Sequence, residues 1–187
     1  MVKLHLGCGS NILDDYMNID YFKFNPIQTN VRNGNASDLK LIGYGAETVD
    51  KIFHQHFIEH LDFWEEKKAW DSWYYVLKNG GELEFDVLDF EWICKKFLDA
   101  EDNWKQFYEA KDNDYFGNGL NYNQRWGVLI AHFFGNAAHP GQYHKNGYTE
   151  KKLINMLKYY NYSKIDVSKF TYEKFGELQC LKVKAIK

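Results

Sequence analysis

Histidine and acidic side chains gather in two parts of this sequence, and both residue types exchange protons with bound molecules in proteins. His56, Glu59 and His60 form the pattern His-x-x-Glu-His. Residues three and four apart lie on one face of a helix, so this pattern can bring two or three polar groups together. The candidate acid–base residues are His56, Glu59, His60, Asp86, Asp89, His132, His139 and His144.

The His-x-x-Glu-His segment has two further interpretations. Its order of residues is also that of one class of zinc proteases, but those enzymes lack a preceding strand and glycine loop. Alternatively, Glu59 and His60 cap and anchor the helix that follows. We favour this structural role over a metal site and expect no bound metal, with His56, Glu59 and His60 as the alternative ligands.

A glycine turn follows the first apolar run, where Leu4–Leu6 lead into Gly7-Cys8-Gly9-Ser10-Asn11. Glycine lets the backbone approach a ligand closely and adopt conformations that a Cβ atom forbids. In open parallel sheets, ligands bind beyond the carboxyl ends of the strands, and Asp20 ends the second candidate strand. A carboxylate there can accept two hydrogen bonds from ribose hydroxyls. A tight turn with a surface aspartate is the alternative, because a lone Gly-x-Gly is a weak motif.

Strands and helices that alternate along the chain must position these residues. Periodicity and turn residues predict helices over Glu65–Leu77, which Asn79-Gly80-Gly81 ends, over Asp89–Tyr108, and from the N-cap Thr149 to Tyr160. The alternation predicts a parallel sheet with crossover helices. The predicted strands are Val2–Leu6, Tyr16–Ile19, Thr29–Gly34, Thr48–His54, Glu82–Val87, Tyr162–Val167 and Glu177–Ile186.

Length and composition favour one ordinary globular domain of 187 residues with a net charge of −3. No dense Lys/Arg run is present, so we expect no nucleic-acid partner. The three cysteines form no Cys-x-x-Cys pair, which argues against a disulfide framework and a cysteine zinc site. The strand-like start leaves no room for a signal peptide, and no apolar run approaches the ~20 residues of a membrane span. We expect a cytoplasmic protein without membrane insertion and leave its oligomeric state open.

Four segments in order resemble the class I S-adenosylmethionine (SAM)-dependent methyltransferases: Leu4–Asn11, Asn18-Ile19-Asp20, Val49–Leu61 and Val76–Asp89. Val76–Leu83 is similar to the family's Leu-Lys-Pro-Gly-Gly segment, with Asn79 in place of proline. His54–Leu61 is similar to its Ser-His-Val-Leu-Glu-His segment. The His-x-x-Glu-His part of it also resembles the Glu-x-x-Glu-His segment of some metal-dependent O-methyltransferases, with His56 in place of the first glutamate. The later His144-Lys145-Asn146-Gly147-Tyr148-Thr149 resembles a motif of short methyltransferases often found beside glycosyltransferases in surface-polysaccharide clusters.

This resemblance implies a Rossmann-like, mostly parallel seven-stranded sheet with helices on both faces and an antiparallel last strand. It implies one SAM-binding domain over residues 1–187, with a substrate-covering insertion around 90–148. Asp20 would hold the ribose, Asp38 would face the adenine amine, and the segment from His54 to His56 would lie beside the sulfonium. The implied cofactor-binding residues are Gly7, Cys8, Gly9, Asp20, Ser37, Asp38, His54 and Gln55. The implied catalytic residues are His56, His60 and His144.

Two departures from the wider pattern matter. Ser10-Asn11 replaces the usual third glycine, and ten residues separate Gly9 from Asp20, against about 20 in the dinucleotide-binding fingerprint. The first crossover helix must therefore be nearly absent. We expect methyl transfer to a small polar acceptor, a sugar or glycan precursor, with O-methylation favoured. The alternatives are a non-catalytic SAM- or nucleotide-binding module and an NAD-dependent sugar-modifying enzyme.

Overall fold

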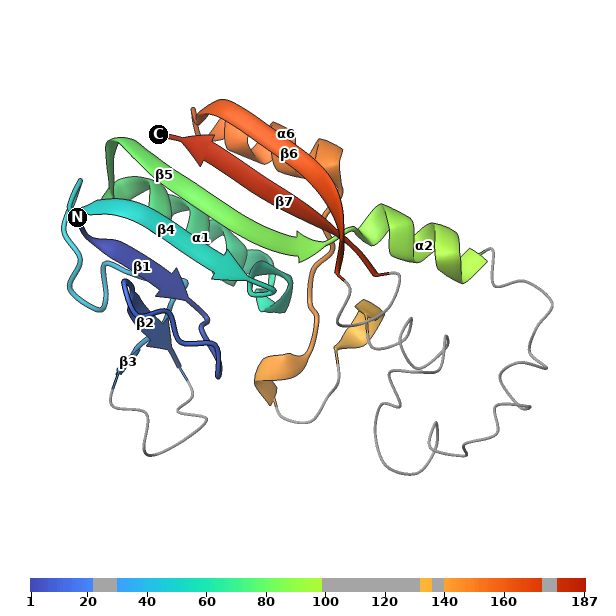
Figure 1. Ribbon diagram of the computed structural model, residues 1–187, viewed down its shortest axis with the longest axis horizontal. Helices are drawn as coiled ribbons and strands as arrows, with labels where there is room; N and C mark the ends of the chain where they lie inside the picture. The colour runs from blue at the N-terminus through green and yellow to red at the C-terminus, as the bar shows by residue number, and fades with distance from the viewer. Residues whose placement is uncertain (22–29, 99–131, 136–139, 173–177) are drawn as a thin grey trace.

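The computed structural model describes residues 1–21, 30–98, 132–135, 140–172 and 178–187 (Figure 1). No helix in these ranges is long and apolar enough to cross a membrane. The elements in chain order are β1 (Lys3–Leu6), β2 (Met17–Asp20), β3 (Val31–Asn33), β4 (Val49–Gln55), the 3₁₀ turn η1 (Ile58–His60), α1 (Phe63–Val76), β5 (Leu77–Leu88), α2 (Phe90–Leu98), η2 (Pro140–Gln142), α6 (Glu150–Tyr159), β6 (Ser163–Tyr172) and β7 (Leu178–Ile186).

Seven strands of the described chain form one sheet in the order β3-β2-β1-β4-β5-β7-β6. The pairs β1–β2, β2–β3, β1–β4 and β4–β5 are parallel, whereas β7 runs antiparallel to β5 and β6. The predicted mostly parallel sheet with an antiparallel last strand is confirmed. β2 and β3 follow on one side of β1, whereas β5, β7 and β6 follow on the other side of β4. The strand order therefore reverses between β1 and β4, and folds of this kind bind ligands at the carboxyl ends of the two strands at such a switch point.

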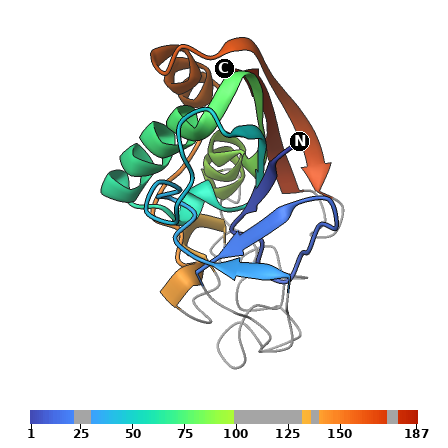
Figure 2. The same cartoon turned by 90° about the vertical axis from the view of Figure 1, so that its left-hand side faces the viewer.

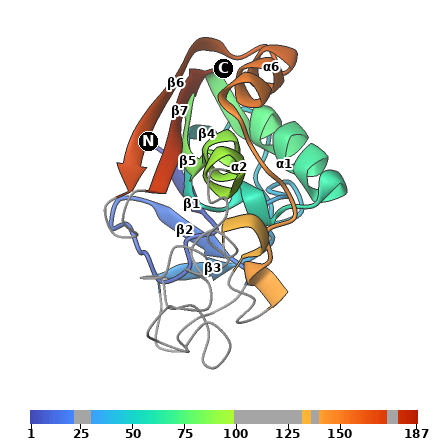
Figure 3. The same ribbon diagram turned by 90° about the vertical axis from the view of Figure 1, so that its right-hand side faces the viewer.

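The main core lies between the sheet and two helices, α1 and α6, which lie on the same side (Figures 2 and 3). Helical spacing along α1 puts Ala69, Trp70, Trp73 and Val76 on one buried face. Burying a large apolar side chain contributes roughly 1.5–3 kcal/mol, so this face holds α1 on the sheet. Its partners in the same cluster include Leu4, Leu6, Ile52, Leu83, Phe85, Val87, Leu153, Leu157, Leu181 and Val183.

The opposite face of the sheet is polar in its middle. Lys51 of β4 and Lys182 of β7 lie 2.6 and 3.2 Å from the carboxylate of Glu84 on β5. Towards the carboxyl end of β5, alternation puts Leu88 on this same face. Leu88 forms a second apolar cluster with Cys180 of β7 and with Ile93 and other side chains of α2. Figure 1 shows α2 extending beyond the carboxyl end of β5, so within the described residues this second face has a helix against it only at that cluster.

A capping box starts α1. The Asp62 carboxylate accepts backbone hydrogen bonds from Trp64 and Glu65 at 2.9 Å, and the Glu65 carboxylate accepts the N–H of Asp62 at 2.9 Å. These bonds satisfy donors that have no partner within the helix. The capping role that sequence analysis assigned to Glu59 and His60 belongs to Asp62 instead, because those two residues lie one turn earlier, in η1.

The helix predicted over Glu65–Leu77 ends at Val76, one residue before its predicted end. The prediction that Asn79-Gly80-Gly81 end it is wrong, because these three residues lie within β5. Leu77 is extended (φ −65°, ψ 136°), fully buried, and paired with Val49. Because the Leu77 side chain is buried in the core, β5 begins at this residue, before the glycines. Gly80, at φ +81°, lies instead where the pairing of β4 with β5 is irregular.

Other boundaries follow from strand pairing. β6 continues to Tyr172 rather than Val167, because Ser168–Tyr172 stay paired with β7. No helix lies between β1 and β2, so the expected loss of the first crossover helix is confirmed. α2 begins where the Asp89 carboxylate accepts the backbone N–H groups of Glu91 and Trp92. The rest of the helix predicted to Tyr108 and most of the insertion around 90–148 lie outside the described residues.

Candidate functional site

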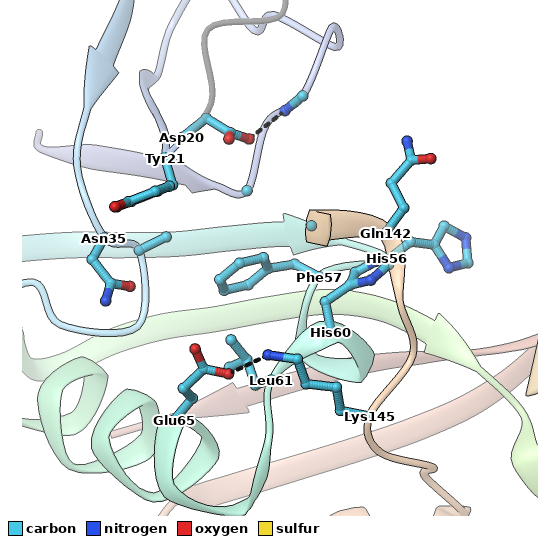
Figure 4. A pocket seen from close by; sticks show the side chains of 14 residues that line it. Asp20, Tyr21, Asn35, His56, Phe57, His60, Leu61, Glu65, Gln142 and Lys145 are labelled. Atoms are coloured by element: carbon cyan, nitrogen blue, oxygen red, sulfur yellow. Dashed lines mark hydrogen bonds and ion pairs between the residues drawn. The ribbon is translucent and has the colours of Figure 1, made fainter. Parts of the chain in front are cut away.

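A pocket of about 540 Å³ lies at the carboxyl ends of β1, β2 and β4 (Figure 4). Asp20, Tyr21 and Asn35 lie at one end of it, and Gln142 and His56 lie at the other. Its volume is within the range of small-molecule sites, roughly 300–1,000 Å³. The lining residues are Gly7, Gly9, Asp20, Tyr21, Asn35, Ala36, His56, Phe57, His60, Leu61, Glu65, Gly141, Gln142 and Lys145.

Two glycines shape the wall that follows β1. Gly7 and Gly9 have φ of +57° and +54°, a backbone conformation that side chains disfavour. A Cβ atom on Gly7 would also lie 2.2 Å from a ring carbon of Phe57. Two separate reasons therefore favour glycine at position 7: the backbone conformation of the turn and the aromatic ring packed against it. Gly7 and Gly9 both line the pocket, and their cofactor-binding role stays a prediction.

Asp20 joins the glycine loop to the neighbouring strand. It ends β2, is 8% exposed, and its Oδ2 atom accepts the Gly9 N–H at 2.8 Å. The bond aligns the loop after β1 with the end of β2. A carboxylate has acceptor sites for several donors, so the same group can also bind a ligand in the pocket.

The loop after β3 contributes different residues from those predicted. Asn35 and Ala36 line the pocket, whereas Ser37 and Asp38 do not. Ser37 is buried and bonds the Asn35 side chain, and Asp38 accepts the backbone N–H of Leu41 at 3.2 Å. Asn35 is not among the predicted site residues, although its place just after β3 gives the same kind of signal as that of Asp20.

Three other predicted cofactor residues lie away from this pocket. His54 is fully buried beside α1, with its ring stacked on Phe85 at 4.5 Å, and burial lowers its pKa to about 3. Alternation along β4 explains this, because His54 shares the core face with Ile52. Cys8 and Gln55 line a second cavity of about 480 Å³. The Gln55 amide donates to Asp86 at 2.9 Å.

The His-x-x-Glu-His segment forms a buried ion pair. His56, at φ +46°, donates from Nδ1 to Glu59 Oε1 at 3.1 Å. Burial lowers the pKa of His56, but contacts with Cys180 and Glu59 outweigh this and raise it to about 10. Burial likewise opposes ionisation of Glu59, whereas His56 brings the pKa of that carboxyl down to about 2. Both groups are therefore charged at neutral pH.

His60 and His144 meet at the same end of the pocket, with ring centroids 4.8 Å apart. Main-chain bonds hold them there: the N–H groups of Lys145 and Asn146 donate to the Glu59 carbonyl at 2.8 and 3.1 Å. The three predicted catalytic residues, His56, His60 and His144, thus lie around Glu59. Burial lowers the pKa of His144, which keeps its imidazole neutral at pH 7.

The remaining acid–base candidates lie elsewhere or outside the described residues. Asp86 and Asp89 bind Gln55 and the start of α2, and neither lines the pocket. His132 is buried, which lowers its pKa to about 4, and its carbonyl accepts a bond from His144. His139 falls outside the described residues.

Several lining residues were given no site role from the sequence. Tyr21 directly follows a predicted site residue, and Phe57 and Lys145 lie within segments that resemble the family, but no role was predicted for any of the three. Lys145 and Glu65 form an ion pair of 3.0 Å at the edge of the pocket, and Gln142 comes from η2. They meet only through the tertiary structure.

Comparison with solved structures identifies the fold. A SAM-dependent methyltransferase from Methanosarcina mazei has a TM-score of 0.61 at 17% identity, over 99% of this chain and 91% of that one. One from Archaeoglobus fulgidus has a TM-score of 0.60 at 15% identity, over 99% and 85%. The Burkholderia thailandensis 1,6-didemethyltoxoflavin-N1-methyltransferase, solved with 1,6-didemethyltoxoflavin and S-adenosylhomocysteine, has a TM-score of 0.58 at 15% identity, over 100% and 70%.

No protein-family model and no curated protein matches the sequence significantly. The likeness therefore lies in the fold, which is the Rossmann-like fold of class I methyltransferases. The link to surface-polysaccharide clusters stays a prediction.

Proposed function

We propose that this protein is a SAM-dependent methyltransferase. The observation that carries the proposal is the pocket lined by Gly7, Gly9 and Asp20, at the switch point of a class I methyltransferase fold. When bound, SAM supplies a methyl group on a positively charged sulfur. The protein's task is then to align a nucleophile with that methyl group.

The pocket residues fit this ligand along its length. Asp20 supplies a carboxylate for the ribose hydroxyls, and Asn35 takes the adenine-facing role that the resemblance assigned to Asp38. Gly7 and Gly9 leave space for the methionine part because neither has a side chain. The sulfonium end then points towards His56 and Gln142, which lie at the far end of the pocket (Figure 4).

The acceptor belongs at the histidine end. Transfer of that methyl group to a hydroxyl would leave the electron pair of the broken carbon–sulfur bond on sulfur and would release the hydroxyl proton, so residues near the acceptor must promote its loss. His56 is not the base, because it is already protonated in its pair with Glu59. We assign the promotion of proton loss to the cluster of Glu59, His60 and His144.

Polar groups around this end of the pocket favour a polar acceptor. Gln142, Lys145 and Glu65 line it beside His60. Such groups suit the hydroxyls of a sugar or glycan precursor, so O-methylation of that class is our proposed reaction.

Calorimetric titration with SAM and with S-adenosylhomocysteine tests the proposal. The wild type should bind both at one site, and Asp20→Ala should weaken binding at least tenfold. Asp71→Ala is the matched control, since Asp71 lies on α1 away from this pocket and pairs with Lys67. Absence of binding by the wild type, or undiminished binding by Asp20→Ala, would contradict it.

Turnover needs its own measurement. We expect release of S-adenosylhomocysteine when the protein is incubated with SAM and a panel of sugars and nucleotide sugars. His144→Gln should lose turnover and keep SAM affinity. Saturable binding of NAD⁺ with no binding of SAM would instead favour a nicotinamide-dependent enzyme.

A further inference from the structure

Three side chains, of which His60 lines the pocket and the other two lie next to it, offer metal-ligating atoms close to one another. One donor atom from each of Glu59, His60 and His144 lies within 4.8 Å of the other two. Ligands around a tetrahedral ion at about 2.1 Å are about 3.4 Å apart, so small side-chain rotations would complete a site. The ligand set differs from the one considered from sequence, because His144 takes the place of His56.

Hydrogen bonds leave the imidazoles in the form that binds metals. His60 Nδ1 is 3.1 Å from the Tyr143 carbonyl, and His144 Nδ1 is 2.8 Å from the His132 carbonyl. A carbonyl only accepts, so each Nδ1 must carry the hydrogen. In the neutral ring the lone pair then resides on Nε2. Metal-binding histidines are usually oriented in this way, through a bond from the other ring nitrogen.

The carboxylate also has an unused acceptor. Glu59 is 2% exposed, and its Oε1 atom accepts the His56 N–H. Its Oε2 atom is buried and has no hydrogen-bond partner in the described part of the chain. Leaving a buried charged oxygen without a partner is costly, and a cation beside His60 and His144 would remove that cost.

We propose that Glu59, His60 and His144 bind one divalent transition-metal ion beside the pocket. Two imidazoles and one carboxylate suit Zn²⁺ and its first-row neighbours, whereas Mg²⁺ and Ca²⁺ prefer oxygen ligands. His56 is not a ligand of this ion; its Nδ1–H donates to Oε1 of Glu59 and orients the carboxylate. Three protein ligands leave at least one coordination position open, as in catalytic zinc sites.

This ion would give the cluster its role in catalysis, a step that rests on the proposed methyltransferase function. A hydroxyl oxygen bound at the open position loses its proton more readily, as water does on zinc. The released proton would go to solvent in the pocket, and the deprotonated hydroxyl would be the nucleophile for the methyl group that SAM supplies. Metal binding itself needs neither SAM nor an acceptor, so the two proposals can fail separately.

Titration of the EDTA-dialysed, full-length protein with Zn²⁺ tests the site, with Co²⁺ absorption as a spectroscopic probe of its ligands. We expect one ion per chain, no heat with Mg²⁺, and a higher melting temperature with Zn²⁺, because an ion that binds the folded state stabilises it. His60→Gln and His144→Gln should each weaken Zn²⁺ binding at least 30-fold. His5→Asn, which removes an imidazole on β1 and keeps all three ligands, should not.

The outcomes separate the hypotheses. Absence of stoichiometric Zn²⁺ binding, or equal affinity in His60→Gln and His144→Gln, would overturn the metal site. Glu59→Gln tests the carboxylate, and the two histidine variants keep the test valid if that buried substitution unfolds the chain. SAM titrated into the metal-free protein reports on the proposed function alone.

Discussion

The carboxylate of Asp20 accepts a hydrogen bond from the backbone N–H of Gly9 at 2.8 Å. Asp20 ends β2, and Gly9 lies in the loop after β1, so one charge-assisted bond joins two parallel neighbours at their carboxyl ends. The residue assigned to hold the ribose thereby also shapes the loop assigned to the methionine part. Changes at Asp20 should therefore affect both stability and ligand binding.

Asp20→Asn should lower the free energy of unfolding by about 1–2 kcal/mol, because an uncharged acceptor replaces a charged one in a buried bond. Urea denaturation without ligand measures this change. Asp71→Asn is the control: its carboxylate makes exposed contacts with Lys67 and the Tyr160 hydroxyl, so this change should move the midpoint much less than Asp20→Asn. Equal stability of Asp20→Asn and the wild type would show that the bond contributes nothing to the fold.

Gly7→Ala should destabilise the protein more than Gly80→Ala. Both glycines have positive φ, which costs about 1–2 kcal/mol for a residue with a side chain. Only at Gly7 does the new Cβ atom meet another group, the Phe57 ring at 2.2 Å, whereas nothing lies within 4 Å at Gly80. Denaturant unfolding of both variants measures the difference.

The double variant Gly7→Ala/Phe57→Ala isolates the clash. We expect it to be less destabilised than the sum of its single substitutions, because the contact disappears with the ring. Simple additivity would mean that the Phe57 ring moves aside at no cost.

Asp62→Ala should lower the melting temperature by roughly 2–4 °C through loss of the capping box. The carboxylate accepts two backbone N–H groups that have no other helical partner. Scanning calorimetry measures the shift, with Asp71→Ala in the middle of α1 as the control. A shift no larger than that of the control would mean that solvent replaces the cap.

Acid should destabilise the protein through His54. Its folded-state pKa of about 3 lies below the ordinary 6.5, so the unfolded chain takes up a proton that the folded chain excludes. The stability is complete above pH 6.5 and falls as the pH drops towards 3. In that window, proton uptake by this one group in the unfolded chain lowers the free energy of unfolding by up to about 1.4 kcal/mol for each pH unit of acidification.

His54→Leu removes that proton uptake. The difference in the free energy of unfolding, His54→Leu minus wild type, should be about 2 kcal/mol larger at pH 5.0 than at pH 7.5. The variant therefore becomes more stable relative to the wild type in acid. Urea denaturation at both values measures the difference. Ile52→Leu, a change in the same core without a titratable group, should have one effect at both pH values. Parallel pH profiles for His54→Leu and the wild type would refute the assignment.

Much of the architecture could be predicted because it depends on near neighbours in the chain. Glycines with positive φ, the polar residue after β2 and the apolar spacing of α1 are each visible within a few residues. The errors arose where long-range packing decides. Burial of Leu77 ends α1 before the glycines, and the alternation of β4 turns His54 into the core.

The sequence by itself determined the order of strands and helices, the glycine loop and the carboxylate that faces it, because local backbone preferences and hydrophobic periodicity act over short distances. Only the tertiary structure decided that His144 meets Glu59 and His60. His144 reaches them because the Lys145 and Asn146 N–H groups bond to the Glu59 carbonyl. That contact joins segments far apart in the chain, and no local pattern encodes it, since it depends on how the loop before α6 packs against η1.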